Sequence, residues 1–202
     1  MSKDLSVALS PAAPGTAILR RLRAPGIVLA GSVLVAACAH LSVPLFFTPV
    51  PLTLQDFAVL VLGLLLPPGL AAATMGAYLA EGALGLPVFA PGPHLVPGPA
   101  HLFGPTGGYL LAYVVAAPLI SILFRRGRRG FAWAFVGAAI GDLLILFCGA
   151  VWLAALTHAS PRFTLAQAVL PFLPGSALKV AAAAGLAAGR LRLRRARDSR
   201  PN

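Results

Sequence analysis

Charged residues are scarce in this chain. Asp, Glu, Lys and Arg make up 10% of its 202 residues, whereas a soluble domain typically contains about 25%. Only 5 residues are acidic, and 58% of the chain is hydrophobic. Such a chain cannot cover a folded domain with a water-facing surface. The composition therefore excludes an ordinary soluble protein and predicts an integral membrane protein.

The chain also lacks the sequence motifs of several functional classes. It has no phosphate-binding nucleotide loop, no His-Glu-x-x-His motif and no Gly-x-Ser-x-Gly motif. Its 2 cysteines, Cys38 and Cys148, lie in apolar stretches and are expected to be small buried hydrophobic residues. The basic segments carry no recognisable nucleic-acid-binding module. We therefore predict no enzymatic activity, no metal site, no cofactor and no nucleic-acid partner.

The long apolar stretches are separated by proline, glycine and arginine. A bilayer core of roughly 30 Å needs about 20 helical residues. We predict an all-α bundle of six transmembrane helices at residues 26–43, 53–66, 69–86, 109–124, 131–157 and 165–189. These form one membrane domain, 26–189, between basic tails at 1–25 and 190–202. The Pro- and Gly-rich segment 87–108 is too irregular to span, and we expect it to fold over the bundle as a lid or plug.

Positive charge is confined to three places. Of the 16 Lys and Arg, all but Arg162 and Lys179 lie in the two tails or in the loop at 125–129. Cytoplasmic loops carry an excess of Lys and Arg. With six spans, the two tails and this loop share one side of the membrane. We therefore predict that both termini are cytoplasmic, in contact with the lipid bilayer surface.

Four ionisable residues fall within the predicted spans: Asp56, Glu81, Asp142 and Lys179. At about 1.5 Å per helical residue, each lies roughly 16–20 Å from the basic face. Charges inside a membrane are costly and usually face a bundle interior or a wet cavity. An acid can also simply hold helices together by hydrogen bonding. Lys179 lies beyond snorkelling reach, so either an acid neutralises it permanently or an anionic ligand does so on binding.

Several neighbours complete a candidate ligand-binding chamber. Ser176 lies three residues before Lys179 and shares its helix face. Gly175 follows Pro174, and the pair can open the backbone toward a ligand. Gln55 offers an amide donor and acceptor. Three aromatic residues are further candidates for the chamber wall, although each also suits a core or an interfacial belt: Phe89, Tyr109 and Trp152.

The first predicted helix carries small residues on one face. Ser32 and Ala36 are four residues apart, and such a pair permits close approach of another helix. Packing within the bundle is the simpler interpretation, and packing against a partner helix is the alternative.

Four segments, taken in order, resemble one family. They are Val-Pro-Leu-Thr-Leu-Gln at 50–55, Gly-Leu-Pro-Val-Phe at 85–89, Gly-Pro-Thr-Gly-Gly-Tyr at 104–109 and Pro-Phe-Leu-Pro-Gly-Ser-Ala-Leu-Lys at 171–179. Together they resemble the BioY family, the biotin-binding S components of energy-coupling-factor (ECF) transporters. The resemblance covers about residues 26–195.

The resemblance implies a six-helix bundle in the bacterial cytoplasmic membrane that binds biotin from outside with high affinity. It implies a membrane coupling protein and two cytoplasmic ATPases as partners, although some members are thought to work without a dedicated module. By the same analogy, Ser32 and Ala36 would meet the coupling protein. Lys179, Ser176 and Gln55 would contact the polar groups of biotin, and the aromatic residues would hold its fused ring.

One position departs from the family pattern, whose last motif usually reads Gly-Asp-x-x-Lys. Ser176 stands at the Asp position, so a hydroxyl replaces a carboxylate. Asp142 and Glu81 are candidates for the compensating acid. An S component for another vitamin and a biotin transporter without ATPases remain the alternatives.

Overall fold

The computed structural model describes residues 14–92, 96, 98–128 and 130–199, and nearly all regular structure in these ranges is helical. The elements in chain order are α1 (Pro14–His40), β1 (Ser42–Val43), β2 (Leu52–Thr53), α2 (Gln55–Leu65), α3 (Pro68–Ala83), the 3-10 helix η1 (Gly98–Phe103), α4 (Gly107–Arg126), α5 (Phe131–Thr157), α6 (Pro161–Ala168) and α7 (Leu173–Asp198).

Prolines set several of these boundaries. Pro67 cannot continue α2 because it has no N–H to donate, and Pro68 suits the first turn of α3, where no donor is needed. Pro161 opens α6 in the same way, and the Ser160 hydroxyl caps it by accepting from the Phe163 N–H at 3.4 Å. The predicted helices 53–66, 69–86, 109–124 and 131–157 all correspond to observed helices, the last with identical bounds.

Two predicted helices differ from the observed ones in their bounds or continuity. α1 begins at Pro14, within the segment predicted to be a tail, and ends at His40 because Ser42 and Val43 pair with Thr53 and Leu52 in a hairpin. The predicted helix 165–189 is broken: α6 ends at Ala168 and α7 begins at Leu173. Pro171 explains the break, since a proline inside a helix removes a hydrogen bond and clashes with the preceding turn.

The helices have the composition of a multi-pass membrane protein. Residues 23–40 of α1, all of α4 and all of α5 are long and apolar enough to cross a bilayer, and α6 with α7 forms a fourth candidate bent by 49°. α2 and α3, with 11 and 16 residues, are shorter than the roughly 20 residues that a span needs. The count of six spans therefore stays a prediction.

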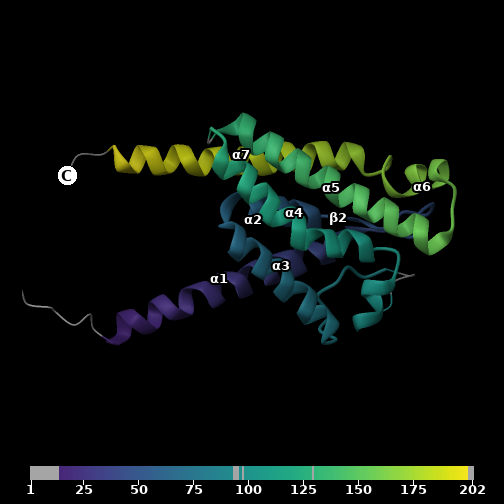
Figure 1. Cartoon of the computed structure of the whole chain (residues 1–202), viewed down its shortest axis with the longest axis horizontal. Helices are drawn as coiled ribbons and strands as arrows, with labels where there is room; N and C mark the ends of the chain where they lie inside the picture. The colour runs from purple at the N-terminus through teal and green to yellow at the C-terminus, as the bar shows by residue number, and fades with distance from the viewer. Residues whose placement is uncertain (1–13, 93–95, 97, 129, 200–202) are drawn as a thin grey trace, which may run out of the picture.

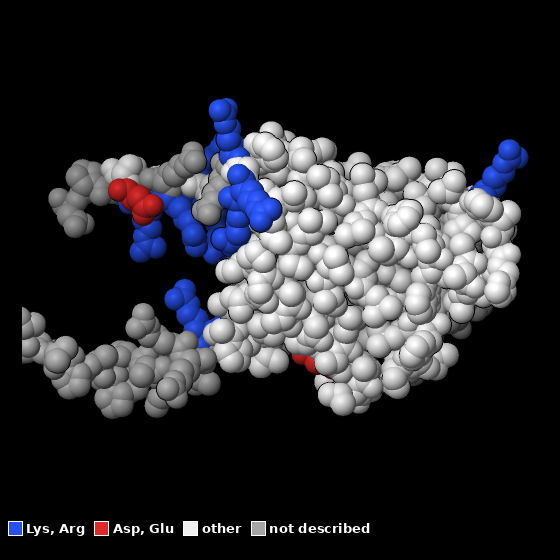
Figure 2. All heavy atoms as spheres, viewed as in Figure 1, with Lys and Arg blue, Asp and Glu red and all other residues white. Residues whose placement is uncertain are grey.

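α2 occupies the centre of the bundle, in contact with α1, α4, α5 and α7 (Figure 1). α1 begins and α7 ends at the same end of the molecule, and Lys and Arg side chains gather there (Figure 2). We call this the basic end. The hairpin, η1 and α6 lie toward the opposite end, which we call the loop end.

Candidate functional site

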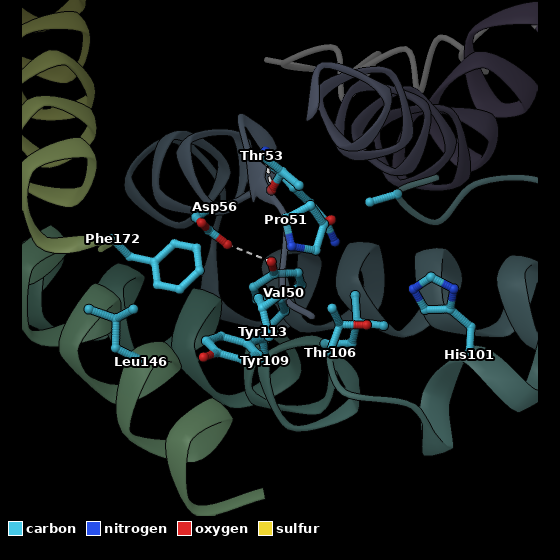
Figure 3. A pocket seen from close by; sticks show the side chains of 13 residues that line it. Val50, Pro51, Thr53, Asp56, His101, Thr106, Tyr109, Tyr113, Leu146 and Phe172 are labelled. Carbon is cyan, nitrogen blue, oxygen red and sulfur yellow. Dashed lines mark hydrogen bonds between the residues drawn. The ribbon is translucent and has the colours of Figure 1, made fainter. Parts of the chain in front are cut away.

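A small cavity of about 30 Å³ lies between the bundle and the segments of the loop end. Its wall comes from the hairpin, the start of α2, the η1 region, α4, α5 and the α6–α7 break (Figure 3). The lining residues are Val50, Pro51, Thr53, Gln55, Asp56, Ala90, His101, Thr106, Tyr109, Leu110, Tyr113, Leu146 and Phe172. Most of this wall is apolar or aromatic, and a few polar groups interrupt it. Ligand sites for small molecules commonly have this character.

Asp56 is the charged centre of the wall. Its Oδ2 accepts from the Lys179 Nζ at 3.0 Å. Its Oδ1 accepts from the Tyr113 hydroxyl at 2.6 Å (Figure 3). The Asp56 side chain is 21% exposed and that of Lys179 is 9% exposed. The buried lysine therefore has an acid partner in this structure, which sits at the same depth on a neighbouring helix.

Gln55 lies beside Asp56, and two successive hydrogen bonds through Tyr78 orient its side chain. The Tyr78 hydroxyl donates to the Val88 carbonyl at 3.0 Å. Because this uses its one hydrogen, Tyr78 must accept from the Gln55 Nε2, which lies 3.1 Å away. The Gln55 Oε1 is thereby left as an acceptor beside the cavity.

Thr106 supplies a polar group with no partner. Its Oγ1 is buried and makes no hydrogen bond with any part of the chain that the structure describes. A buried hydroxyl without a partner is uncommon, because its lost hydration is not compensated. Since Thr106 lines the cavity, a ligand there could supply the missing hydrogen bond.

Tyr109 lies where the helix break meets the cavity. Its hydroxyl donates to the Ala168 carbonyl at 2.7 Å, which satisfies a backbone group at the end of α6. Its ring faces the cavity together with Phe172 in the break, with the ring centroids 6.4 Å apart (Figure 3). The break that sequence analysis missed therefore forms part of the cavity wall.

Asp142 and Ser176 form a second polar layer behind Lys179. Both are buried, on α5 and α7 respectively, and they lie next to each other across the contact of these helices. Asp142 also lies within electrostatic range of Asp56 and Lys179. Gly175 lies against Leu52 of β2, so a Cβ there would approach the Leu52 side chain at 3.5 Å.

Of the predicted site residues, Gln55 and Tyr109 line the cavity, and Lys179 lies next to it through its ion pair with Asp56. Three further predicted residues have other partners. Glu81 accepts from the Ser32 hydroxyl at 2.8 Å, across the contact of α1 and α3. Phe89 packs between Tyr78 and His101. Trp152 donates to the Gly104 carbonyl at 2.9 Å and so anchors the start of the Gly104–Tyr109 segment.

Ser32 and Ala36 pack inside their own bundle. Ser32 is completely buried by α3, and Ala36 packs against the hydrophobic core. Ser32 has no exposed surface in this bundle, whereas Ala36 is half-buried, and packing of this face against a partner helix stays a prediction.

Some lining residues were not predicted to contact the ligand, although the sequence carries a signal for them. Asp56 was predicted at the same depth as Lys179, which indicates a pair, but it was assigned no ligand contact. Tyr113 follows Tyr109 by four residues and therefore shares its helix face. Phe172 lies within the segment 171–179 that carries the resemblance, but its side chain was not predicted to form the chamber wall. His101 was not predicted to line the cavity, because its position depends on how an irregular segment folds back.

Histidines do not gather into a metal site in the described ranges, where no group of three His, Cys, Asp or Glu residues comes together. His94 lies outside the described residues. Burial lowers the pKa of His101 below its usual value, and a hydrogen bond with the Val96 backbone opposes this effect only in part. His101 is therefore a neutral wall residue at pH 7.

Comparison with known proteins gives consistent matches. The BioY family profile matches residues 12–197. The chain is 38% identical over 135 residues to a probable biotin transporter BioY of Pyrococcus horikoshii, covering 67% of this chain and 76% of that protein. It is 31% identical over 169 residues to a biotin transporter BioY of Thermotoga maritima, covering 84% and 94%. A crystal structure of the S-component for biotin from an ECF-type ABC transporter superposes with a TM-score of 0.77 at 26% identity, covering 86% of this chain and 92% of the other.

Proposed function

The chain belongs to the BioY family, and from this premise we propose that it binds biotin in the loop-end cavity and mediates its uptake across the membrane. The observation that carries the proposal is the set of polar groups that converge on this otherwise apolar cavity: the Asp56–Lys179 pair, the Gln55 carbonyl oxygen and the unpartnered Thr106 hydroxyl.

The chemistry of biotin matches this wall. Its ureido group offers two N–H donors and a carbonyl acceptor, and its fused ring and thioether are apolar. We propose that Asp56 or Gln55 accepts from the ureido N–H groups and that Lys179 donates to an oxygen of the vitamin. The rings of Tyr109 and Phe172 would cover the fused ring, as aromatic side chains do in mixed pockets.

The structure also suggests how the serine at position 176 is accommodated. A carboxylate is missing there, but Asp142 lies beside Ser176 and Asp56 reaches the same lysine from α2. We propose that these two acids supply the negative charge that Lys179 requires. Glu81, the other candidate for this role, is directed to α1 instead.

Transport requires partners in this proposal. The chain contains no phosphate-binding nucleotide loop, so ATP hydrolysis would come from an ECF module with a membrane coupling protein and two ATPases. We propose six spans, formed by α1–α5 and α7, in the bacterial cytoplasmic membrane with the basic end cytoplasmic. The cavity would then open outward. Uptake without a dedicated module is the alternative.

Calorimetric titration of the detergent-purified chain tests the proposal. We expect saturable binding of biotin and no competition by thiamine or riboflavin. Lys179→Ala should weaken binding by about an order of magnitude or more, because a charge-assisted hydrogen bond contributes roughly 1.5–3 kcal/mol. Glu81→Gln is the matched control, since it removes an intramembrane charge outside the cavity and should leave the affinity unchanged. If the folded chain does not bind biotin, or binds another vitamin more tightly, the proposal that it is a biotin-binding protein is wrong.

A further inference from the structure

A second cavity, of about 80 Å³, lies at the basic end. It is formed where the ends of α2 and α4 meet α7, and it is lined by Leu65, Phe124, Arg125, Ala187, Arg190, Leu191 and Arg194. Three arginines thus surround a floor made only of apolar side chains. The cavity shares no residue with the proposed biotin site.

Two of the arginines are placed by helical spacing. Arg190 and Arg194 are four residues apart on α7 and therefore lie one turn apart on the same face. Leu191 and Ala187 continue that face toward the bundle core. The side of α7 that packs on the bundle therefore passes directly into the arginine-lined opening.

Arg125 is positioned by a relay from the end of α2. The Ser121 hydroxyl donates to the Leu66 carbonyl at 2.6 Å, and the Arg125 Nε donates to the Ser121 oxygen at 3.0 Å. A guanidinium group has five N–H donors. The hydrogen bonds that the structure describes use only the one on Nε, so the four N–H donors on the two Nη atoms remain for a ligand.

No acid neutralises these arginines within the described ranges. The single ion pair found there is Asp56–Lys179, at the other end of the bundle. Three guanidinium groups around one opening repel one another unless an anion sits between them. Arginine is also the side chain best matched to the geometry of a phosphate.

We propose that this cavity binds the phosphate group of an anionic phospholipid. The basic end of a multi-pass protein lies at the membrane surface, where headgroup phosphates are concentrated, and basic pockets between helices are known to take such headgroups. The apolar floor of Leu65, Phe124 and Leu191 suits the upper part of an acyl chain, which free phosphate lacks. The lipid would connect α2, α4 and α7 at the end where each of them terminates or leaves the bundle.

Native mass spectrometry of the purified chain, released from nanodiscs of phosphatidylcholine with added phosphatidylglycerol, tests the proposal. We expect the unsubstituted chain to retain phosphatidylglycerol in preference to phosphatidylcholine. The variant R125Q/R190Q/R194Q should lose about a hundredfold in apparent affinity, because each basic residue near an anionic surface contributes about 1 kcal/mol. The variant R23Q/R128Q/R197Q is the matched control, because it removes the same charge from arginines outside the cavity, and it should retain the lipid.

Three results would overturn the proposal. Equal losses in the two triple variants would mean that net charge, not this cavity, attracts the lipid. Full retention in R125Q/R190Q/R194Q, with circular dichroism and elution volume unchanged, would place the lipid elsewhere. Displacement of phosphatidylglycerol by millimolar inorganic phosphate would identify a free-anion site in place of a lipid site.

Discussion

At the scale of single residues, the buried pair of Asp56 and Lys179 is the strongest constraint on the bundle. Two charges lose their hydration when they enter the interior, and their attraction repays this only where further hydrogen bonds support them. Tyr113 provides such support to Asp56, and Asp142 and Ser176 lie behind Lys179. Removing the charge of Asp56 or of Lys179 alone should therefore lower the stability of the folded chain, whereas removing both charges together should lower it less.

A double-mutant cycle should reveal this asymmetry. Lys179→Gln leaves a buried carboxylate without its cation and should destabilise the chain by about 3–5 kcal/mol. Adding Asp56→Asn removes the orphaned charge and should recover much of that loss. The thermal unfolding midpoint in detergent measures both effects. Purely additive losses would mean that the two charges are not coupled.

The substitution Thr106→Val should affect the stability of the folded chain and its affinity for biotin differently. The substitution removes a buried hydroxyl that has no partner and keeps its shape, so the ligand-free chain should be at least as stable as before. If biotin supplies the missing hydrogen bond, its affinity should fall roughly three- to tenfold, the value of about one hydrogen bond. Thermal unfolding and calorimetric titration of the same sample test the two halves. A loss of stability without a loss of affinity would contradict the proposed contact.

His101 should make the stability of the loop end depend on pH. Its pKa in the folded chain is lowered by burial, whereas the unfolded chain has a value of about 6.5. Below about pH 6.5 the unfolded state therefore binds more protons, and stability falls as pH falls through this window. Unfolding midpoints between pH 7.5 and 5 should decrease more steeply for the unsubstituted chain than for His101→Gln. Parallel curves would exclude His101 as the cause.

At the scale of elements, apolar length and proline placement predicted most helices of the bundle. Residues 131–157 were predicted with the observed bounds because Gly130 and His158 stand outside a long apolar stretch in which Asp142 is the one charged residue. The break between α6 and α7 was missed although Pro171 and Pro174 are visible in the sequence. In the sequence, a proline near a helix start cannot be distinguished from a proline in a helix break. The difference depends on which group hydrogen-bonds to the backbone at the break, and here the Tyr109 hydroxyl donates to the Ala168 carbonyl.

The contact between α4 and α5 offers a test of packing. A Cβ on Gly149 would overlap the Tyr109 ring, so Gly149→Ala must displace the side chain that holds the Ala168 carbonyl. We expect a cost of about 1–3 kcal/mol, typical of overpacking, together with weaker biotin binding. Gly185→Ala in α7 is the control, because its Cβ would meet open space. This control should be neutral or stabilise the helix by up to about 1 kcal/mol. A stable Gly149→Ala chain with normal affinity would show that Tyr109 is free to move.

At the scale of the whole molecule, the sequence predicted the distribution of charge better than the site. The positive segments gather at one end of the molecule because α1 begins and α7 ends there (Figure 2). The ionisable site residues were predicted from their depth, which places Lys179, Asp56 and Asp142 in one layer. Depth does not specify which way a side chain faces around its helix, and for this reason Glu81 was grouped with residues from which the bundle separates it.

Topology follows from the charge distribution and can be measured in intact cells. With Cys38 and Cys148 replaced by alanine, a single cysteine at Ala159 would report on the loop end and one at Ser199 on the basic end. Positive segments are retained on the cytoplasmic side, so a membrane-impermeant maleimide should label Ala159→Cys directly and Ser199→Cys only after permeabilisation. Biotin binding by both variants confirms that each is folded. Labelling of Ser199→Cys in intact cells would invert the bundle and direct the proposed biotin cavity toward the cytoplasm, where it could not capture the vitamin from outside.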